Sequence, residues 1–490
     1  MPMSYSQNIQ DLLAPAQTSL RDALQLMDSN AQGIVFVVDA EQKVSGVLTD
    51  GDVRRFLLKG GSLEAPVEEV MTTSFVSLPN TSSIEDIQRK LSNKIRHIPL
   101  LDESGKIVDC ASRNRLRRIP VMEPQLGGNE LNYVTQCVQT SWISSQGKFV
   151  RQFEEMVAAY CGMPYALATS NGTVALHLAL EALGIEEDDE IIVPNLTFAA
   201  SINAILYSGA TPVLVDCDHD NWNASVRAIE AAITPYTRAI MPVHLYGHPC
   251  RMDEIVALAE KHDLWVVEDA AEALGSEWKG QRVGSFGEAA TFSFFGNKTI
   301  TTGEGGMVLF RDQEVYEHAK ILRDHGMSKS RRYWHDFVGY NYRMTNLQAA
   351  IGVAQMERVD EIVAAKIALG KAYNEAFAEV EQLITPPIVE EAVDTYWLYT
   401  LRLKHGGAAE RDELIQKLAA NGIETRPVFY PLHEMPPYED FAEGKMFPNS
   451  TQISYSGISL PSSTTLKPEE IQNIVETIKA VFETRAMLEG

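Results

Sequence analysis

The chain has 490 residues, of which 45% are hydrophobic and 22% charged, and its formal net charge is -24. This length and composition are typical of two or three domains, each with its own hydrophobic core. The acidic balance argues against non-specific binding to nucleic acids and to anionic membranes, because both carry negative charge.

The cysteines and the apolar segments indicate where in the cell the protein is expected. The five cysteines are scattered, with no CxxC pair, which is typical of reduced thiols rather than of a disulfide framework. No basic segment followed by an apolar run opens the chain, and no apolar run reaches the roughly 20 residues that span a bilayer. His244 and His248 have no acid or cysteine to complete a metal site. We therefore expect a cytoplasmic protein without a metal.

The first 120 residues contain two copies of one pattern. TSLRDALQLM leads to IVFVVDAEQKVSGVLTDGDVRR, and SSIEDIQRKL leads to IPLLDESGKIVDCASRNRLRR. Each copy is a helical pattern, a strand, a polar turn, a second strand and a helix start, which predicts one module of two similar halves. This region resembles a pair of CBS motifs.

The resemblance to CBS motifs implies a ligand. Members of that family often bind adenosine nucleotides, and a G-x-x-T-x-x-D run holds ribose and phosphate. The first copy supplies Gly46, Thr49 and Asp52, whereas the second has Arg115 in place of the acid. The resemblance therefore implies at most one adenosine site, at Thr49 and Asp52. A purely structural or dimerising module is the alternative.

After a Pro- and Gly-containing linker at 119–130, short apolar runs alternate with helical patterns. The runs are YALATS, DEIIVPN, TPVLVDCD, RAIMPVHLYG and LWVVEDA. This alternation predicts a mostly parallel sheet covered by helices on both faces. One long helical pattern follows at about 345–380, and shorter strands and helices after it predict a small α+β domain. The predicted domains are 1–120, 121–380 and 381–490.

Three groups follow predicted strands, where ligands bind in open α/β sheets. SNGT, residues 170–173, opens a helix, and free amides there suit a phosphate. Asp269 ends the run LWVVED and needs a partner, which could be a protonated ring nitrogen or an internal salt bridge. Lys298, in SFFGNKTITTGEGG, has no acid within five residues. An unpaired, partly desolvated lysine is a nucleophile.

These three groups together indicate pyridoxal 5′-phosphate (PLP). A lysine can bond to the cofactor, and an acid can keep its ring nitrogen protonated so that the ring accepts electrons. A helix N-terminus can hold its phosphate. The sequence therefore predicts a PLP-dependent enzyme.

From about residue 125 to the end, eight runs resemble the DegT-type nucleotide-sugar aminotransferases. That family has the aspartate aminotransferase fold, PLP fold type I. The resemblance implies a large α/β domain and a small C-terminal α+β domain. The runs are SWISSQGKFVRQFE, SNGTVALHLAL, PNLTFAASINA, VHLYGHPCRMDEI, VEDAAEALGS, SFFGNKTITTGEGG, GYNYRMTNLQAAIG and IETRPVFYPLH.

The resemblance also implies a role for single residues. Lys298 would be the Schiff-base lysine and Asp269 the partner of the pyridine nitrogen. Asn341 would reach the phosphate bound by a neighbouring subunit, which implies a homodimer or larger assembly with shared sites. The other implied cofactor contacts are Gly172, Thr173 and Ser293 at the phosphate, Phe198 stacked on the ring and Glu272 beside it.

The substrate follows from two runs, RRYWHDFVGYNYRMTN and TRPVFYPLH, which look most like the subgroup that makes GDP-perosamine. We expect amination of GDP-4-keto-6-deoxymannose with glutamate as donor, for surface polysaccharide synthesis. Arg331, Arg426 and His433 are candidate diphosphate or sugar contacts, or else surface charges. The alternatives are a UDP-linked 4-keto-6-deoxy-N-acetylhexosamine, another PLP reaction on this fold, or a regulatory protein without turnover.

Overall fold

The computed structural model describes the chain except for residues 1–8, 31, 83, 93, 113–118 and 490. Internal contacts divide the chain into two compact units, Met1–Arg118 and Ile119–Gly490, which are described separately below. In the part of the chain that the structure describes, none of the helices combines the length and the apolar character that a membrane span requires.

The first unit consists of two copies of one arrangement, as the sequence predicts. In the first copy β1 pairs parallel with β2, which pairs antiparallel with β3, and β4, β5 and β6 repeat this in the second copy. The elements are η1 (Ile9–Leu12), β1 (Leu13–Pro15), α1 (Leu20–Asn30), β2 (Ile34–Val38), β3 (Val44–Thr49), α2 (Asp50–Leu58), η2 (Val67–Glu69), β4 (Leu78–Pro79), α3 (Ile84–Lys90), β5 (His97–Leu101) and β6 (Ile107–Ser112).

The repeat extends to the hydrogen bonds of the hairpin turns. Asp39 Oδ1 accepts from the backbone amides of Glu41 and Lys43, both at 2.9 Å. Asp102 Oδ1 accepts from the amides at the same offsets, at 2.9 and 3.0 Å. An aspartate that bonds the backbone two residues on favours a turn, so the same residue type closes both hairpins.

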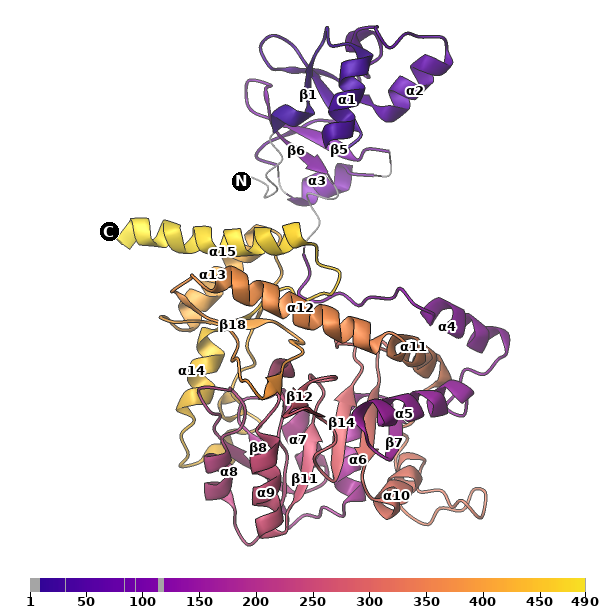
Figure 1. The fold of residues 1–490 in the computed structure, drawn as a ribbon, viewed down its shortest axis with the longest axis vertical. Coiled ribbons are helices and arrows are strands. Elements are labelled where there is room, and N and C mark those ends of the chain that lie inside the picture. Colours follow the sequence, from indigo (N-terminus) through magenta and orange to yellow (C-terminus); the bar gives the residue numbers. More distant parts are fainter. Residues whose placement is uncertain (1–8, 31, 83, 93, 113–118, 490) are drawn as a thin grey trace. The chain divides into compact units, whose positions relative to one another are not determined.

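The second unit is built on a seven-stranded sheet in the order β7-β15-β14-β11-β10-β8-β9. Figure 1 labels β7, β8, β11 and β14 of this sheet. β15 runs antiparallel to both of its neighbours, and all other pairings are between strands of the same direction. The mostly parallel sheet predicted from sequence is confirmed. The strands are β7 (Tyr165–Thr169), β8 (Glu190–Pro194), β9 (Thr211–Val215), β10 (Thr237–Ile240), β11 (Trp265–Asp269), β14 (Ala289–Ser293) and β15 (Gly306–Phe310).

Helices cover both faces of this sheet. Successive strand residues point to opposite faces, and in β15 Met307 and Leu309 pack with α5 and α11, whereas Val308 and Phe310 pack with α6 and α10. Every residue of β15 is buried. The helices around the sheet are α4 (Glu130–Gln139), α5 (Lys148–Cys161), α6 (Gly172–Ala182), α7 (Ala199–Tyr207), α8 (Val226–Ala232), α9 (Met252–His262), α10 (Gln313–Arg323) and α11 (Asn346–Met356).

The C-terminal region packs on the long helix α12 (Val359–Phe377) around an antiparallel sheet in the order β16-β18-β20-β19. Leu369 and Tyr373 of α12 share one core with Leu401 of β18. The remaining elements are η3 (Leu245–Gly247), β12 (Glu277–Trp278), β13 (Gln281–Arg282), β16 (Leu383–Ile384), β17 (Ala392–Val393), β18 (Thr400–Leu403), α13 (Ala408–Ala420), β19 (Arg426–Pro427), η4 (Leu432–Glu434), η5 (Glu439–Ala442), α14 (Pro448–Ser456), β20 (Gly457–Ser459) and α15 (Pro468–Glu489).

The start of the predicted linker belongs to this C-terminal region. Ile119 is buried, and its N–H donates to the carbonyl of Gly422 at 2.8 Å. The backbone pairing of Ile119 with Ile423 explains why the second unit begins at residue 119. A division of this unit into two domains near residue 380 stays a prediction.

Candidate active site

A cavity of about 700 Å³ lies where the parallel strands of the large sheet end. The ends of β7, β11 and β14 reach it because these three strands point the same way. Residues from the C-terminal region complete the wall. Its lining includes Ser170, Asn171, Gly172, Thr173, Phe198, Asp269, Glu272, Ser293, Lys298, Trp397, Arg426 and Phe429.

One side of the cavity is the N-terminus of α6. Asn171 caps this helix, and its side chain accepts from the amide of Val174 at 3.0 Å. A Cβ on Gly172 would lie 2.9 Å from Cβ of Ser293, so the glycine allows the helix start and the end of β14 to approach closely. The first amides of a helix have no partner within the helix. Together with the Ser293 hydroxyl, they form a cradle that suits a phosphate.

Asp269 lies at the end of β11 and is 4% exposed. Its Oδ2 accepts from the Ser201 hydroxyl at 2.8 Å, and its Oδ1 accepts from the amide of Ala271 at 3.1 Å. Burial raises the pKa of the Asp269 carboxyl, and these hydrogen bonds and the charge of Lys298 oppose the rise. A carboxylate fixed in this way can accept from a ring N–H and favour its protonated form.

Lys298 lies in the turn that follows β14, and Glu272 is its neighbour. The Lys298 Nζ lies 3.6 Å from Oε1 of Glu272. Burial lowers the pKa of the lysine, with Glu272 and Asp269 opposing, and burial raises the pKa of Glu272 to about 7, with Lys298 opposing. The sequence prediction of an unpaired lysine is therefore wrong, because Lys298 has Glu272 as its partner. The turn after β11 brings an acid from 26 residues earlier in the chain.

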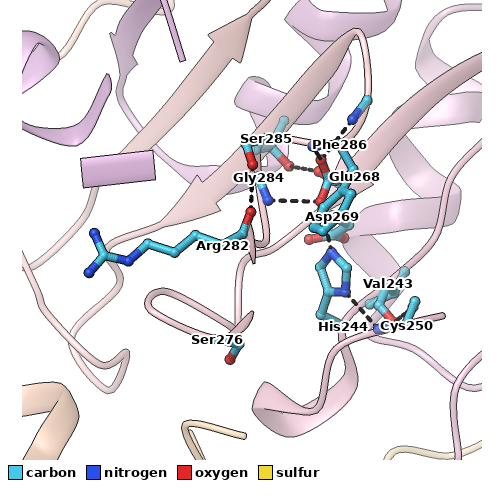
Figure 2. A network of polar contacts seen from close by, with 12 residues as sticks. Val243, His244, Cys250, Glu268, Asp269, Ser276, Arg282, Gly284, Ser285 and Phe286 are labelled. Carbon is cyan, nitrogen blue, oxygen red and sulfur yellow. Dashed lines mark hydrogen bonds and ion pairs between the residues drawn. The ribbon is translucent and has the colours of Figure 1, made fainter. Parts of the chain in front are cut away.

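Glu268, the residue before Asp269, holds the loop that precedes β14 (Figure 2). Its carboxylate is fully buried and accepts from the amides of Gly284, Phe286 and Gly287 at 2.7 to 2.9 Å. His244 Nε2 lies 3.1 Å from the same carboxylate, while His244 Nδ1 accepts from the amide of Cys250 at 3.0 Å. Both ring nitrogens of His244, which lies near Asp269 in Figure 2, are therefore engaged, by Glu268 and by the amide of Cys250.

The structure brings most of the predicted site residues together. Gly172, Thr173, Phe198, Asp269, Glu272, Ser293, Lys298 and Arg426 all line the one cavity. Phe198 is 59% exposed, and its ring lies 5.7 Å from that of Phe429, so one face is available for packing on a ligand.

Three predicted residues lie outside the lining of this cavity. The His433 ring contacts the Asn195 side chain. The Arg331 guanidinium covers the Trp334 ring at 4.4 Å, in an exposed loop. Asn341 is exposed, and its side chain accepts from Arg343 at 3.3 Å.

Ser201 and Trp397 were not among the site residues predicted from the sequence. Ser201 lies one turn into α7, and its position three residues after Phe198 in PNLTFAAS is a signal that could have suggested it. Trp397 comes from the segment between β17 and β18, and its ring centroid lies 3.6 Å from Lys298 Nζ. No local pattern links Trp397 to a lysine 99 residues earlier.

The first unit has a cavity of its own, of about 630 Å³. Thr49 and Asp52 line it together with cationic residues from both copies of the repeat, which are Arg54, Arg55, Lys94 and Arg96. Asp52 Oδ2 accepts from the amide and the hydroxyl of Thr49, at 3.0 and 2.6 Å, and Arg55 pairs with Oδ1. Arg115, which replaces the acid in the second copy, lies outside the described residues.

A lysine beside buried acids, facing a phosphate cradle at the strand ends of an α/β sheet, defines the class of PLP-dependent enzymes with the aspartate aminotransferase fold. The chain belongs to the DegT/DnrJ/EryC1/StrS aminotransferase family, whose family model matches residues 124–479. The CBS domain model matches residues 10–59 and 67–122. Both resemblances seen in the sequence are confirmed, and the chain is a PLP-dependent sugar aminotransferase preceded by a pair of CBS motifs.

Two relatives are similar to this chain over nearly the whole of their own length. A GDP-perosamine synthase of Caulobacter vibrioides is 48% identical over 368 residues, which are 75% of this chain and 99% of the relative. A GDP-perosamine synthase of Escherichia coli O157:H7 is 47% identical, over 75% of this chain and 99% of the relative.

A solved structure supports the fold. A Streptococcus pneumoniae protein described as a sugar aminotransferase, in its PLP form, superposes with a TM-score of 0.71 and 30% identity. The match covers 75% of this chain and 99% of that protein.

Proposed function

We propose that the chain transfers the amino group of glutamate to C4 of GDP-4-keto-6-deoxymannose, giving GDP-perosamine for a surface polysaccharide. The observation that carries this proposal is the joint placement of Lys298, Asp269 and the α6 N-terminus around one cavity. The similarity to two GDP-perosamine synthases supports the choice of sugar.

In this proposal each residue has one task at the cofactor. Bound PLP supplies an electron sink for the negative charge that develops at the reacting carbon. Asp269 would hold the ring nitrogen protonated, and Lys298 would take and return the proton at the reacting carbon of the substrate. Gly172, Thr173 and Ser293 would hold the phosphate, Phe198 would pack on the ring, and Glu272 would lie beside it.

The sugar nucleotide needs cations at its diphosphate, although the chain as a whole is acidic. Arg426 lines the cavity, and its side chain is 49% exposed although it lies 3.6 Å from Glu424. Part of its guanidinium is therefore available to an anion. Arg331 and His433 are the other candidate contacts, although neither lines the cavity of its own chain. Arg331 would need a neighbouring subunit, or movement of its loop, to act there.

We propose further that the working unit is a homodimer with shared sites. Asn341, exposed on its own chain, would reach the phosphate in the neighbouring subunit. The exposed aromatic residues near it in the sequence, Tyr333, Trp334 and Phe337, are consistent with a surface that a second copy covers.

Mass spectrometry of reaction products tests the substrate. The enzyme is incubated with glutamate and a panel of GDP- and UDP-linked 4-keto-6-deoxy sugars. We expect a GDP-linked 4-amino sugar from GDP-4-keto-6-deoxymannose. Amination of a UDP-linked 4-keto-6-deoxy-N-acetylhexosamine alone would contradict the GDP assignment and leave the aminotransferase class intact.

For the first unit we propose one adenosine nucleotide, bound at Thr49 and Asp52. Asp52 would accept bonds from the ribose hydroxyls, since a carboxylate oxygen accepts more than one hydrogen bond. Arg54 and Arg55 would lie near the phosphates, and Lys94 and Arg96 of the second copy line the same cavity. Calorimetric titration of the full chain with AMP, ADP and ATP tests this. If none of the three nucleotides gives a heat of binding, the module has a structural or dimerising role instead.

A further inference from the structure

Trp397 lies against the reactive lysine although nothing in its sequence neighbourhood marks it. The Lys298 Nζ is 3.6 Å from the centroid of the indole ring, and Trp397 is 4% exposed. An ammonium over the face of an indole is attracted by the negative charge of that face, and more strongly when both are desolvated. The contact therefore acts on the atom that carries out the chemistry.

Trp397 is anchored at both of its ends. Its indole N–H donates to the carbonyl of Asn297 at 2.6 Å, next to Lys298 in the chain. Its own carbonyl accepts from Lys366 Nζ at 2.8 Å. Lys366 is fully buried and also donates to the carbonyl of Ser462 at 2.6 Å, and burial lowers its pKa to about 7. With the main chain and the indole both held, the ring keeps one orientation.

Tyr246 packs against the same ring. The Tyr246 and Trp397 rings are stacked with their centroids 6.0 Å apart and an angle of 15° between their planes, and the Phe429 ring also stacks on Tyr246, with a centroid distance of 5.2 Å. The Tyr246 amide donates to Glu272 Oε2 at 2.7 Å. Tyr246 thus connects the ring that faces Lys298 with the carboxylate that faces Lys298.

The backbone at Tyr246 is strained. Its φ of 54° lies in the left-handed region, where residues other than glycine are uncommon and which is often found at functional sites. The following Gly247 has φ of 104°, and a Cβ there would lie 2.9 Å from the amide nitrogen of Tyr396 and 3.0 Å from that of Trp397. The HLYG turn therefore needs its glycine in order to approach the Trp397 segment.

We propose that Trp397 is a positioning residue for Lys298, and that its ring face holds the lysine amine beside Glu272 whenever the amine is not bonded to the cofactor. This inference rests on the proposed transamination, in which the amine is released when glutamate binds and must then give and take a proton. Asp269 and Glu272 face the amine as negative groups. Glu304 and Arg426 are the other charged residues of the cavity lining. The ring adds attraction for the protonated amine without adding charge.

Graded fluorination of Trp397 tests the attraction without changing the packing, since each fluorine weakens the negative face but barely alters the volume. Tryptophans with one to four fluorine atoms are introduced at position 397 of the full-length chain by stop-codon suppression. The chain is freed of cofactor, and the pH dependence of Lys298 acetylation is followed by peptide mass spectrometry. We expect the acetylation midpoint to fall stepwise, by roughly 0.5 to 1 pH unit in total.

Trp278 offers a matched control, because its ring is buried and lies 5.6 Å from a different lysine, Lys279. The same fluorinated series at position 278 is expected to leave the Lys298 midpoint unchanged. The substitution Trp397→Phe keeps an aromatic face that is less negative than that of indole. We expect its Lys298 acetylation midpoint to lie between those of the wild-type chain and of the chain with four fluorine atoms on Trp397.

A Lys298 midpoint that stays constant across the series at position 397 overturns the inference. An equal shift from the series at position 278 overturns it too, since the effect would then not come from the ring that touches the lysine. Neither result depends on turnover. If the proposed function is wrong, the wild-type enzyme, without any fluorinated residue, will aminate none of the keto-sugars of the panel.

Discussion

The cavities of the two units contain similar residue types, but they are assembled in different ways. In the first unit Thr49 and Asp52 are three residues apart at the start of α2, and cations surround them. In the second unit the groups come from segments far apart in the sequence, such as 170–173, 269–272 and 293–298, and Asp269, Glu272 and Lys298 are withdrawn from solvent. Covalent chemistry at an amine needs the second arrangement, because desolvation favours the uncharged, nucleophilic form. Reversible binding of an anion needs only the first.

The largest expected effect is on the buried acid of the second unit. Asp269→Asn should still bind PLP but lose turnover by roughly a hundred- to a thousandfold, because a neutral amide does not hold the ring nitrogen protonated. Steady-state kinetics and the cofactor content of the purified variant measure the two effects. Near-normal turnover of Asp269→Asn would mean that Asp269 does not hold the ring nitrogen protonated.

The shared-site proposal predicts complementation between two inactive variants. Lys298→Ala and Asn341→Ala subunits, mixed and allowed to reassort at random, should recover about a quarter of the wild-type activity, since one site of each mixed dimer has both native residues. Each variant alone is the control and should be strongly impaired. Full activity of Asn341→Ala by itself would remove the support for a shared site.

For the first unit, Asp52→Asn should weaken the binding of ATP by roughly tenfold or more, because a charged acceptor is lost at the ribose. Asp22→Asn is a matched control, since Asp22 accepts from the Ser19 hydroxyl at 2.8 Å in a similar pair at the start of α1 and does not line the cavity. Titration calorimetry on both variants gives the comparison. Equal ATP affinity in Asp52→Asn and the wild-type chain would exclude the ribose contact.

The smallest effect concerns the buried amine behind Trp397. The folded state lowers the pKa of Lys366 to about 7 from an ordinary value of 10.5, so the unfolded chain binds more protons between these two pH values. The group therefore costs stability at and below pH 7, and this cost disappears as the pH rises towards 10.5. Relative to Lys366→Met, the apparent unfolding temperature of the wild-type chain should rise by a few degrees over that interval. A temperature difference independent of pH would contradict this.

Much of both units could be predicted from the sequence because their signals are local. The repeat shows in two similar runs, and the parallel sheet shows in short apolar runs that end in turns. Asp269, Lys298 and the start of α6 could be predicted because each lies at the end of a strand or in the turn after it, and parallel strands bring their ends to one edge.

The contacts across the cavity could not be predicted, for a physical reason. Lys298 has no acid near it in sequence, yet Glu272 lies 3.6 Å away, because the turn after β11 returns to the site. Trp397 reaches the lysine only through the packing of the C-terminal region on the large sheet. Such contacts depend on the relative placement of distant segments, and no spacing along the chain encodes them. The antiparallel direction of β15 likewise depends on which strands become its neighbours.

Reduction of the purified enzyme with borohydride, followed by peptide mapping, tests the central claim most directly. Because Lys298 is the lysine in the cavity that holds the phosphate cradle and the buried acid, the account predicts a pyridoxyl group fixed on the peptide that contains Lys298, with loss of visible absorbance. A pyridoxyl group on another lysine, or none in an enzyme that transfers amino groups, would contradict it.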